Sequence, residues 1–160
     1  MSTRKQFCAA PNPRMQLTKF SDYALRVLMY VAQRDGRHVT IAEIARAHGI
    51  SENHLMKVVN QLARFEYLST LRGKGGGIKL ARPAAEISIG AVVRDLEPLA
   101  VVECLAHGYD GACRLTARCG LQRLMRDAQQ TFLQALDERS LADVIGPGRT
   151  LRAATSAVAS

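Results

Sequence analysis

Three of the four cysteines of this 160-residue chain lie within sixteen residues, in the stretch ECLAHGYDGACRLTARCG. Cys104, Cys113 and Cys119 are separated by eight and five residues, so the stretch has no CxxC pair and lacks the spacing of a zinc ribbon. His107, between the first two, could complete a zinc site. Three thiolates also suit an iron–sulfur cluster whose remaining iron takes a different ligand. The remaining interpretation is structural, with three small buried side chains.

The cellular compartment helps to decide between the metal-binding and structural interpretations of the cysteines. The chain has no run of eighteen apolar residues, and its first residues, MSTRKQFCAAPNPR, contain no apolar stretch long enough for a signal peptide. We therefore expect a cytoplasmic protein whose thiols stay reduced, in which clustered cysteines indicate metal or redox chemistry. A thiol redox enzyme would need a poised nucleophile and a resolving partner, and without a CxxC we expect no enzyme.

The charge of the chain points to a polyanionic partner. The formal net charge is +8 and the isoelectric point is about 9.8. Such an excess is typical of proteins that bind nucleic acid or an acidic membrane surface, although it can also serve solubility alone. Where the basic residues lie along the chain decides between these interpretations.

The stretch VTIAEIARAHGISENHLMKVVNQLARFEYL predicts two short helices joined by a turn. Thr40 and Glu43 form a capping-box pattern that begins the first helix, and Gly49 ends it. Ser51 caps the second helix, which faces inward through Leu55, Val58, Val59 and Leu62. This arrangement is typical of a helix-turn-helix.

The next stretch, YLSTLRGKGGGIKLARP, predicts a β-hairpin with a glycine-rich tip. No acidic residue occurs between Tyr67 and Ala85, so a helix-turn-helix followed by a basic hairpin predicts a winged helix that binds DNA. The second helix should enter the major groove, the basic wing should meet phosphates or the minor groove, and the glycines should permit close backbone approach. The predicted contact residues are Ser51, Asn53, His54, Lys57, Arg72, Lys74, Gly75 and Gly76.

Three further helices are predicted. The first, FSDYALRVLMYVAQRDG, is capped by Ser21 and ended by Gly36, and a short one begins at Ser88 and stops at Pro98. A long helix runs from about Leu121 to Asp137 and carries an apolar seam, which favours a homodimer, while packing onto its own domain is the alternative. The seam consists of Leu121, Met125, Ala128, Phe132 and Ala135, supplemented by Leu124 and Leu136.

Much of the chain resembles the NsrR/IscR family of bacterial winged-helix regulators, and the NsrR type in particular. The resemblance rests on MQLTKFSDYALRVLMYVA, ISENHLMKVVNQLARFEYLSTLRGKGGGIKLARP, IGAVVRDLEPL, the three cysteines and LADVI. It implies a dimeric repressor that binds a palindromic operator and carries one iron–sulfur cluster per subunit. The implied ligands are Cys104, Cys113 and Cys119, with Asp22 contributed by the other subunit.

The resemblance implies that nitric oxide is the signal and that nitrosylation of the cluster releases the DNA. The implied cluster is of the 4Fe-4S type, with 2Fe-2S as the alternative. An iron–sulfur-status regulator of the IscR type, or a cluster-free winged-helix regulator with zinc or no metal, remains an alternative. No membrane partner is expected. The fold class is mostly α with a small β-hairpin wing, divided into a disordered extension (1–14), the winged helix-turn-helix (15–98), a cluster-binding loop (99–120), the dimerisation helix and end of the fold (121–145) and a disordered tail (146–160).

Overall fold

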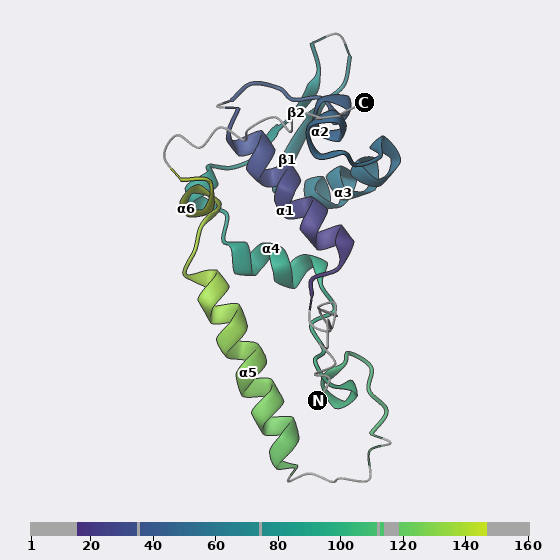
Figure 1. Ribbon diagram of the computed structural model, residues 1–160, viewed down its shortest axis with the longest axis vertical. Helices are drawn as coiled ribbons and strands as arrows, with labels where there is room; N and C mark the ends of the chain where they lie inside the picture. Colours follow the sequence, from purple (N-terminus) through teal and green to yellow (C-terminus); the bar gives the residue numbers. More distant parts are fainter. Residues whose placement is uncertain (1–15, 35, 74, 112, 114–118, 147–160) are drawn as a thin grey trace, which may run out of the picture.

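Figure 1 shows the computed structural model, in which residues 16–34, 36–73, 75–111, 113 and 119–146 are described. The predicted extension and nearly all of the predicted tail lie outside these residues. One long helix extends away from a body of shorter helices and a hairpin (Figure 1). The elements in chain order are α1 (Lys19–Ala32), α2 (Ile41–His48), α3 (Glu52–Arg64), β1 (Leu68–Leu71), β2 (Gly77–Leu80), η1 (Ala84–Glu86), α4 (Ile89–Leu96), η2 (Glu103–Leu105), α5 (Gly120–Asp137) and α6 (Leu141–Ile145).

Helix α1 begins earlier and ends earlier than predicted. Thr18, not Ser21, is the N-cap, and its hydroxyl accepts the Ser21 N–H at 3.3 Å while Ser21 itself is buried. The side chain of Glu97, which is remote in sequence, accepts the Thr18 N–H at 2.6 Å and so helps to fix this cap. The helix ends at Ala32 rather than at Gly36. Both serine and threonine are good N-caps, so a tertiary contact decided between them.

The helix-turn-helix is confirmed. The Thr40 hydroxyl accepts the Glu43 N–H at 3.2 Å, and Gly49 ends α2 in the left-handed region with φ of 64°. The Glu43 carboxylate binds Arg37 at 2.5 Å and accepts the Tyr30 hydroxyl at 3.1 Å, so this carboxylate ties α2 to α1. The hydrogen bond from Arg37 lowers the pKa of Glu43. The predicted inward face of α3 is buried in a mostly aliphatic core shared with α1, which contributes Ala24, Val27, Leu28, Tyr30 and Val31.

The hairpin is also confirmed. Strands β1 and β2 are antiparallel, with Leu68 opposite Leu80 and Leu71 opposite Gly77. Val39, in the segment before α2, exchanges two backbone hydrogen bonds of 2.8 and 2.9 Å with Ile78. The base of the wing is therefore held on both sides of β2 and fixed to the helix-turn-helix.

The end of the chain returns to the body. Helix α4 begins after the Ser88 cap and ends just before Pro98, as predicted, and α5 matches its predicted range within one residue. Helix α6 follows with a capping box formed by Ser140 and Asp143, and Leu141 is fully buried in the core beside α1.

The predicted seam of α5 is only partly covered within one chain. Leu136 packs against the core, whereas Leu121 is 51% exposed and Leu124 is 61% exposed. Leu133, which the seam omitted, is the buried residue of α5. Packing against α4 sets this rotation of the helix about its axis, and it leaves most of the predicted seam on the surface.

Candidate functional site

The first candidate site is the outer face of α3. Ser51 caps the helix by accepting the His54 N–H at 3.4 Å, so its hydroxyl is committed to the helix end. Asn53, His54 and Lys57 are exposed, because Leu55, Val58, Val59 and Leu62, the buried residues of α3, occupy its opposite face. Met56 is also 48% exposed on this surface and was not among the predicted contact residues. These side chains project from a rigid, capped helix, which is the arrangement needed to contact base edges.

The second candidate site is the wing. Arg72 and Gly75 are exposed at the tip, and Lys74 lies outside the described residues. Gly76 donates its N–H to the Gly73 carbonyl at 2.9 Å, and a Cβ on Gly76 would lie 2.2 Å from the Leu71 carbonyl oxygen. The turn therefore requires glycine at position 76 for its own packing, apart from any contact with DNA.

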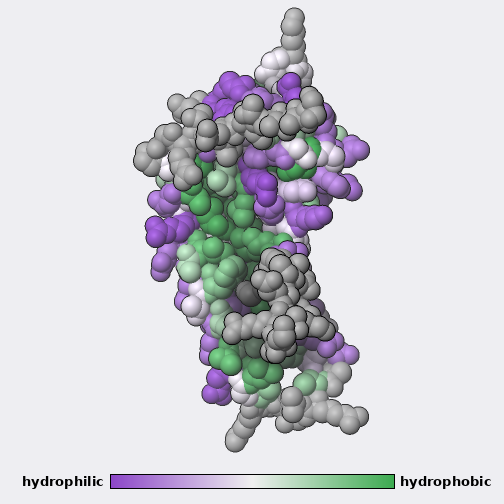
Figure 2. Space-filling view, viewed as in Figure 1, coloured by the Kyte–Doolittle hydropathy of each residue, from purple (hydrophilic) through white to green (hydrophobic). Residues whose placement is uncertain are grey.

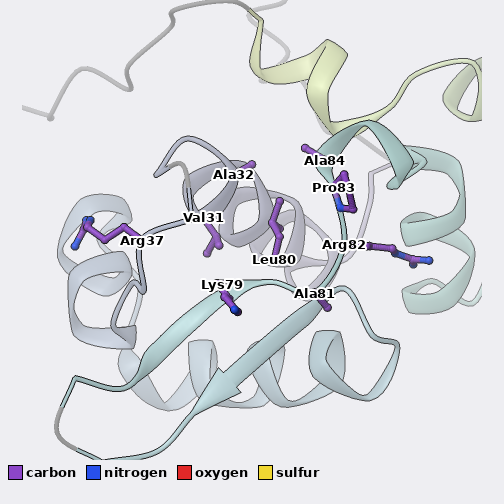
Figure 3. Close-up of a pocket in the computed structure, with 10 residues that line it drawn as sticks. Val31, Ala32, Arg37, Lys79, Leu80, Ala81, Arg82, Pro83 and Ala84 are labelled. Carbon is purple, nitrogen blue, oxygen red and sulfur yellow. The ribbon is translucent and has the colours of Figure 1, made fainter.

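The basic residues of the hairpin do not all face the same way. Arg82 places its guanidinium 4.6 Å from the centre of the Tyr67 ring, and Figure 3 shows it pointing toward α4. Lys79, a residue of β2 that also lines the hollow shown in Figure 3, points in a different direction. This hollow has a volume of about 420 Å³ and its lining is both apolar and basic. Arg82 thus has a structural contact that the sequence did not indicate.

The cysteine segment packs beside the start of α5. Cys104 lies in η2 and is half-buried, Cys119 is the N-cap residue of α5 and is half-buried, and Cys113 is exposed. The Gln122 side chain donates to the Cys104 carbonyl at 3.3 Å, which holds η2 against α5. The Tyr109 hydroxyl accepts the Cys113 N–H, and burial raises the pKa of this phenol.

The donor chemistry of this segment fits an iron–sulfur cluster, because three free thiols share one segment and none is fully buried. Within the described part of the chain, however, no three His, Cys, Asp or Glu side chains are gathered as a metal site. All of the residues that join Cys113 to Cys119, residues 114–118, lie outside that part. Asp22, in the first turn of α1, forms an ion pair of 2.9 Å with Arg26. The predicted ligand set remains a prediction.

An apolar groove runs between α4 and α5. Figure 2 shows apolar side chains gathered in a band that follows these helices. The groove has a volume of about 710 Å³, and its lining includes Leu25 of α1, Val93 of α4 and Phe132 of α5. In a single chain it is open to solvent. Separately, no helix among the described residues combines the length and the apolar character that crossing a bilayer requires.

Two polar links were missed by the sequence reasoning. Tyr67 donates its hydroxyl to Asp95 at 2.6 Å, and Arg94 donates to Asp137 at 2.8 Å. Burial and the hydrogen bond to Asp95 raise the pKa of Tyr67 to about 12. The partners are 28 and 43 residues apart, so no local pattern could have paired them.

Comparison with known proteins agrees with this architecture. Residues 17–147 match the model of the Rrf2 family, which is described as an iron-dependent transcriptional regulator. The fold is similar to IscR of T. potens, with a TM-score of 0.68 and 22% identity over 82% of this chain and 87% of that chain. It is similar to CymR, described as the global cysteine regulator of B. subtilis, with a TM-score of 0.67 and 22% identity over 82% of this chain and 96% of that chain. It also resembles the oxidized form of S. aureus CymR, with a TM-score of 0.66 and 22% identity over 85% of this chain and all of that one. These likenesses establish a mostly helical winged-helix fold with a two-stranded antiparallel hairpin.

Proposed function

This chain belongs to the Rrf2 family of transcriptional regulators, and we propose that it is a dimeric repressor that senses nitric oxide through an iron–sulfur cluster. Regulators of this family bind DNA and act as dimers; they are not enzymes. The observation that carries the proposal is the set of three free thiols, Cys104, Cys113 and Cys119, on one segment packed against the start of α5.

The DNA side of the proposal uses α3 and the wing. Asn53 can bond adenine through both side-chain polar atoms, and Lys57 can reach guanine or phosphate. His54 is exposed beside them, and Ser51 fixes the helix end that carries all three. Arg72 and Lys74 would contact phosphates or the minor groove from the wing, where Gly75 and Gly76 shape the tip. Contacts from two such surfaces fit a palindromic operator.

The sensing side uses the cysteine segment. Cys104, Cys113 and Cys119 would hold the cluster, and Asp22 of the partner subunit would supply an oxygen ligand. When bound, an iron–sulfur cluster supplies iron that reacts with small diatomic molecules or reports iron supply. Cys119 occupies the N-cap position of α5, so the positive end of that helix would lie beside a bound anionic cluster. Asp22 would exchange its ion pair with Arg26 for this role.

The dimer side rests on apolar surface. Leu121 and Leu124 are more than half exposed, and the groove between α4 and α5 is open in a single chain. Burying one such leucine in a partner's groove is worth about 1.5–3 kcal/mol. Leu124→Glu should therefore shift sedimentation equilibrium toward monomer, whereas Arg123→Glu, at an exposed polar position one residue earlier, should leave the dimer intact.

The cluster is tested by iron and acid-labile sulfide in anaerobically purified protein. We expect iron and sulfide, with a brown chromophore, in the wild-type protein and in the control Cys8→Ser, which alters the fourth cysteine of the chain, outside the cysteine segment. Cys104→Ser, Cys113→Ser and Cys119→Ser should each lose iron. A colourless wild-type protein that contains zinc and no sulfide would leave these thiols with a structural role.

An iron-status regulator of the IscR type is the second candidate, favoured by the iron-dependent description of the family. The two functions separate in an anaerobic DNA-binding assay on operator duplexes selected by the wild-type protein. Under the nitric oxide proposal, substoichiometric nitric oxide releases DNA. If nitric oxide leaves binding unchanged while chelation of iron alters it, the second candidate is correct.

A further inference from the structure

Tyr67 connects three parts of the DNA-binding body. Its N–H donates to the Leu62 carbonyl in the last turns of α3 at 2.9 Å, and its carbonyl accepts the Ala81 N–H, just after β2, at 3.1 Å. Its hydroxyl donates to Asp95 on α4 at 2.6 Å. Tyr67 is only 2% exposed, so one buried residue joins α3, which is the proposed recognition helix, to the wing and to α4.

The ring of Tyr67 makes a second contact, with Arg82. The Arg82 guanidinium lies 4.6 Å from the ring centre, and Figure 3 shows this side chain directed from the end of β2 toward α4. A cation over an aromatic face is attracted by the electron density of the ring. A displacement of α4 relative to Tyr67 must therefore be shared by the wing or must break these contacts.

The other side of α4 is tied to α5. Arg94 binds Asp137 through both terminal nitrogens, one at 2.8 Å, and the Ser88 hydroxyl donates to the same carboxylate at 3.3 Å. A Cβ on Gly90 would lie 2.1 Å from the Asp137 carboxylate, so the contact requires glycine at position 90. Neighbouring residues of a helix point about 100° apart, which lets Arg94 reach α5 while Asp95 reaches Tyr67.

Backbone contacts fix the same end of α5. The Ile89 N–H donates to the Arg139 carbonyl at 3.0 Å, and the Leu141 N–H donates to the Ile87 carbonyl at 2.8 Å. The opposite end of α5 carries Cys119 and, at a rise of 1.5 Å per residue, lies about 27 Å away. Figure 1 shows this end standing clear of the body. A movement there turns α5 about the end that is joined to α4.

We propose that Arg94 and Asp95 are positioning residues that couple the orientation of α5 to Tyr67, and thereby to the recognition helix and the wing. The coupling is a property of the fold and holds whatever signal moves α5. Its use in gene regulation rests on the proposed function, in which the signal acts on the cysteine segment at the far end of α5.

Amide hydrogen exchange on the iron-free full-length protein tests the coupling without any cluster. Asp137→Asn weakens the contact with Arg94, and Asp127→Asn, at an exposed position of the same helix, is the matched control. We expect Asp137→Asn to raise exchange in α4 and also, by about three- to fivefold, in the wing amides of β1 and β2. Faster exchange confined to α4, α5 and α6, or equal exchange in both variants, would overturn the proposal.

A second pair of variants tests the link at Tyr67. Tyr67→Phe removes the hydrogen bond to Asp95 and keeps the ring, while Tyr30→Phe removes the hydrogen bond from a buried tyrosine to Glu43, away from the proposed coupling. In a double-mutant cycle, the wing amides of Tyr67→Phe/Asp137→Asn should exchange no faster than those of the faster single variant, because both substitutions interrupt the same connection between α5 and the wing. If the two substitutions instead multiply each other's effect on wing exchange, they act on separate connections and the proposal is refuted.

A DNA-binding assay on the operator then tests whether the coupling contributes to regulation, separately from whether it exists in the fold. If loaded and iron-free wild-type proteins differ in DNA affinity, Tyr67→Phe should bring that ratio at least threefold closer to one, and Tyr30→Phe should not. An unchanged ratio in Tyr67→Phe overturns the coupling as a regulatory link. Equal affinity of the two wild-type forms refutes the proposed sensing function, and the exchange experiments still decide the coupling.

Discussion

Gly76→Ala should distort the tip of the wing, although alanine adds a single carbon. The Cβ of alanine would lie 2.2 Å from the Leu71 carbonyl oxygen, 2.9 Å from the Gly73 oxygen and 3.0 Å from the Leu71 carbonyl carbon. The shortest normal carbon–oxygen contact is about 3.3 Å, so the contact with the Leu71 oxygen would be about 1.1 Å too short. All three atoms belong to the backbone, so no side chain can rotate away to relieve the overlap.

The expected loss of stability follows from the hydrogen bonds that the turn must lengthen or break. To admit the methyl group, the turn has to lengthen the hydrogen bond from Gly76 to Gly73, which is 2.9 Å, and to loosen the adjacent pair of Leu71 and Gly77. One to two hydrogen bonds and the residual overlap together cost about 1–3 kcal/mol. Local deformation can absorb part of this, so exchange of the β1 and β2 amides should respond more strongly than global unfolding.

Two other glycines provide matched controls. At Gly75, φ is +83° and no atom lies within 4 Å, so alanine there meets backbone strain of about 1–2 kcal/mol and no overlap. At Gly120, the first residue of α5, alanine meets open space at an ordinary φ and should stabilise the protein by at most about 1 kcal/mol.

The assay is denaturant unfolding together with amide exchange for all three variants and the wild-type protein. We expect Gly76→Ala to destabilise the wing most, Gly75→Ala less, and Gly120→Ala not at all. Wing exchange in Gly76→Ala equal to that of wild type, or slower than in Gly75→Ala, would refute the argument that position 76 requires glycine for space.

The remaining predictions concern charge and capping. The pKa of Tyr67 is raised to about 12 in the folded protein, so folding favours the protonated phenol. The resulting contribution to stability is complete below the usual pKa of 10.0 and declines as the pH rises toward 12. Tyr67→Phe lacks this contribution, so the stabilities of the two proteins in alkaline unfolding curves should converge between pH 10 and 12. Ser51→Ala removes the acceptor of the His54 N–H and should lower stability by about 0.5–1 kcal/mol in urea unfolding, with an unchanged result arguing against the cap. Lys74→Ala should weaken DNA binding at all sequences and reduce the salt slope by about one; an unaltered slope would remove Lys74 from the interface.

Most helix ends and the hairpin turn were predictable from the sequence, because the residues that specify them lie close together along the chain. Caps such as Thr40 and Ser51, the stop at Gly49 and the glycine-rich turn act within a few residues, and the structure confirms them. The start of α1 was not predictable in the same way, because Thr18 and Ser21 are both competent caps and Glu97, far along the chain, fixes Thr18.

The candidate sites, too, were predictable only in the features that depend on local sequence. That α3 faces outward with Asn53, His54 and Lys57 follows from the spacing of its apolar residues, and the three thiols are visible as residue types. Whether those thiols meet one cluster remains a prediction, since it depends on distances that spacing does not fix.

The sequence by itself therefore determined most of the helices, the hairpin and the donor chemistry, because the signals for each, namely caps, turn residues and residue types, are local along the chain. Only the tertiary structure decided that Arg82 stacks on Tyr67, that α5 turns Leu133 inward, that Arg94 binds Asp137 and that Tyr67 donates to Asp95. Those contacts join residues up to 43 positions apart. The physical reason is that the packing of whole elements selects one partner for each polar group among many compatible with its local surroundings.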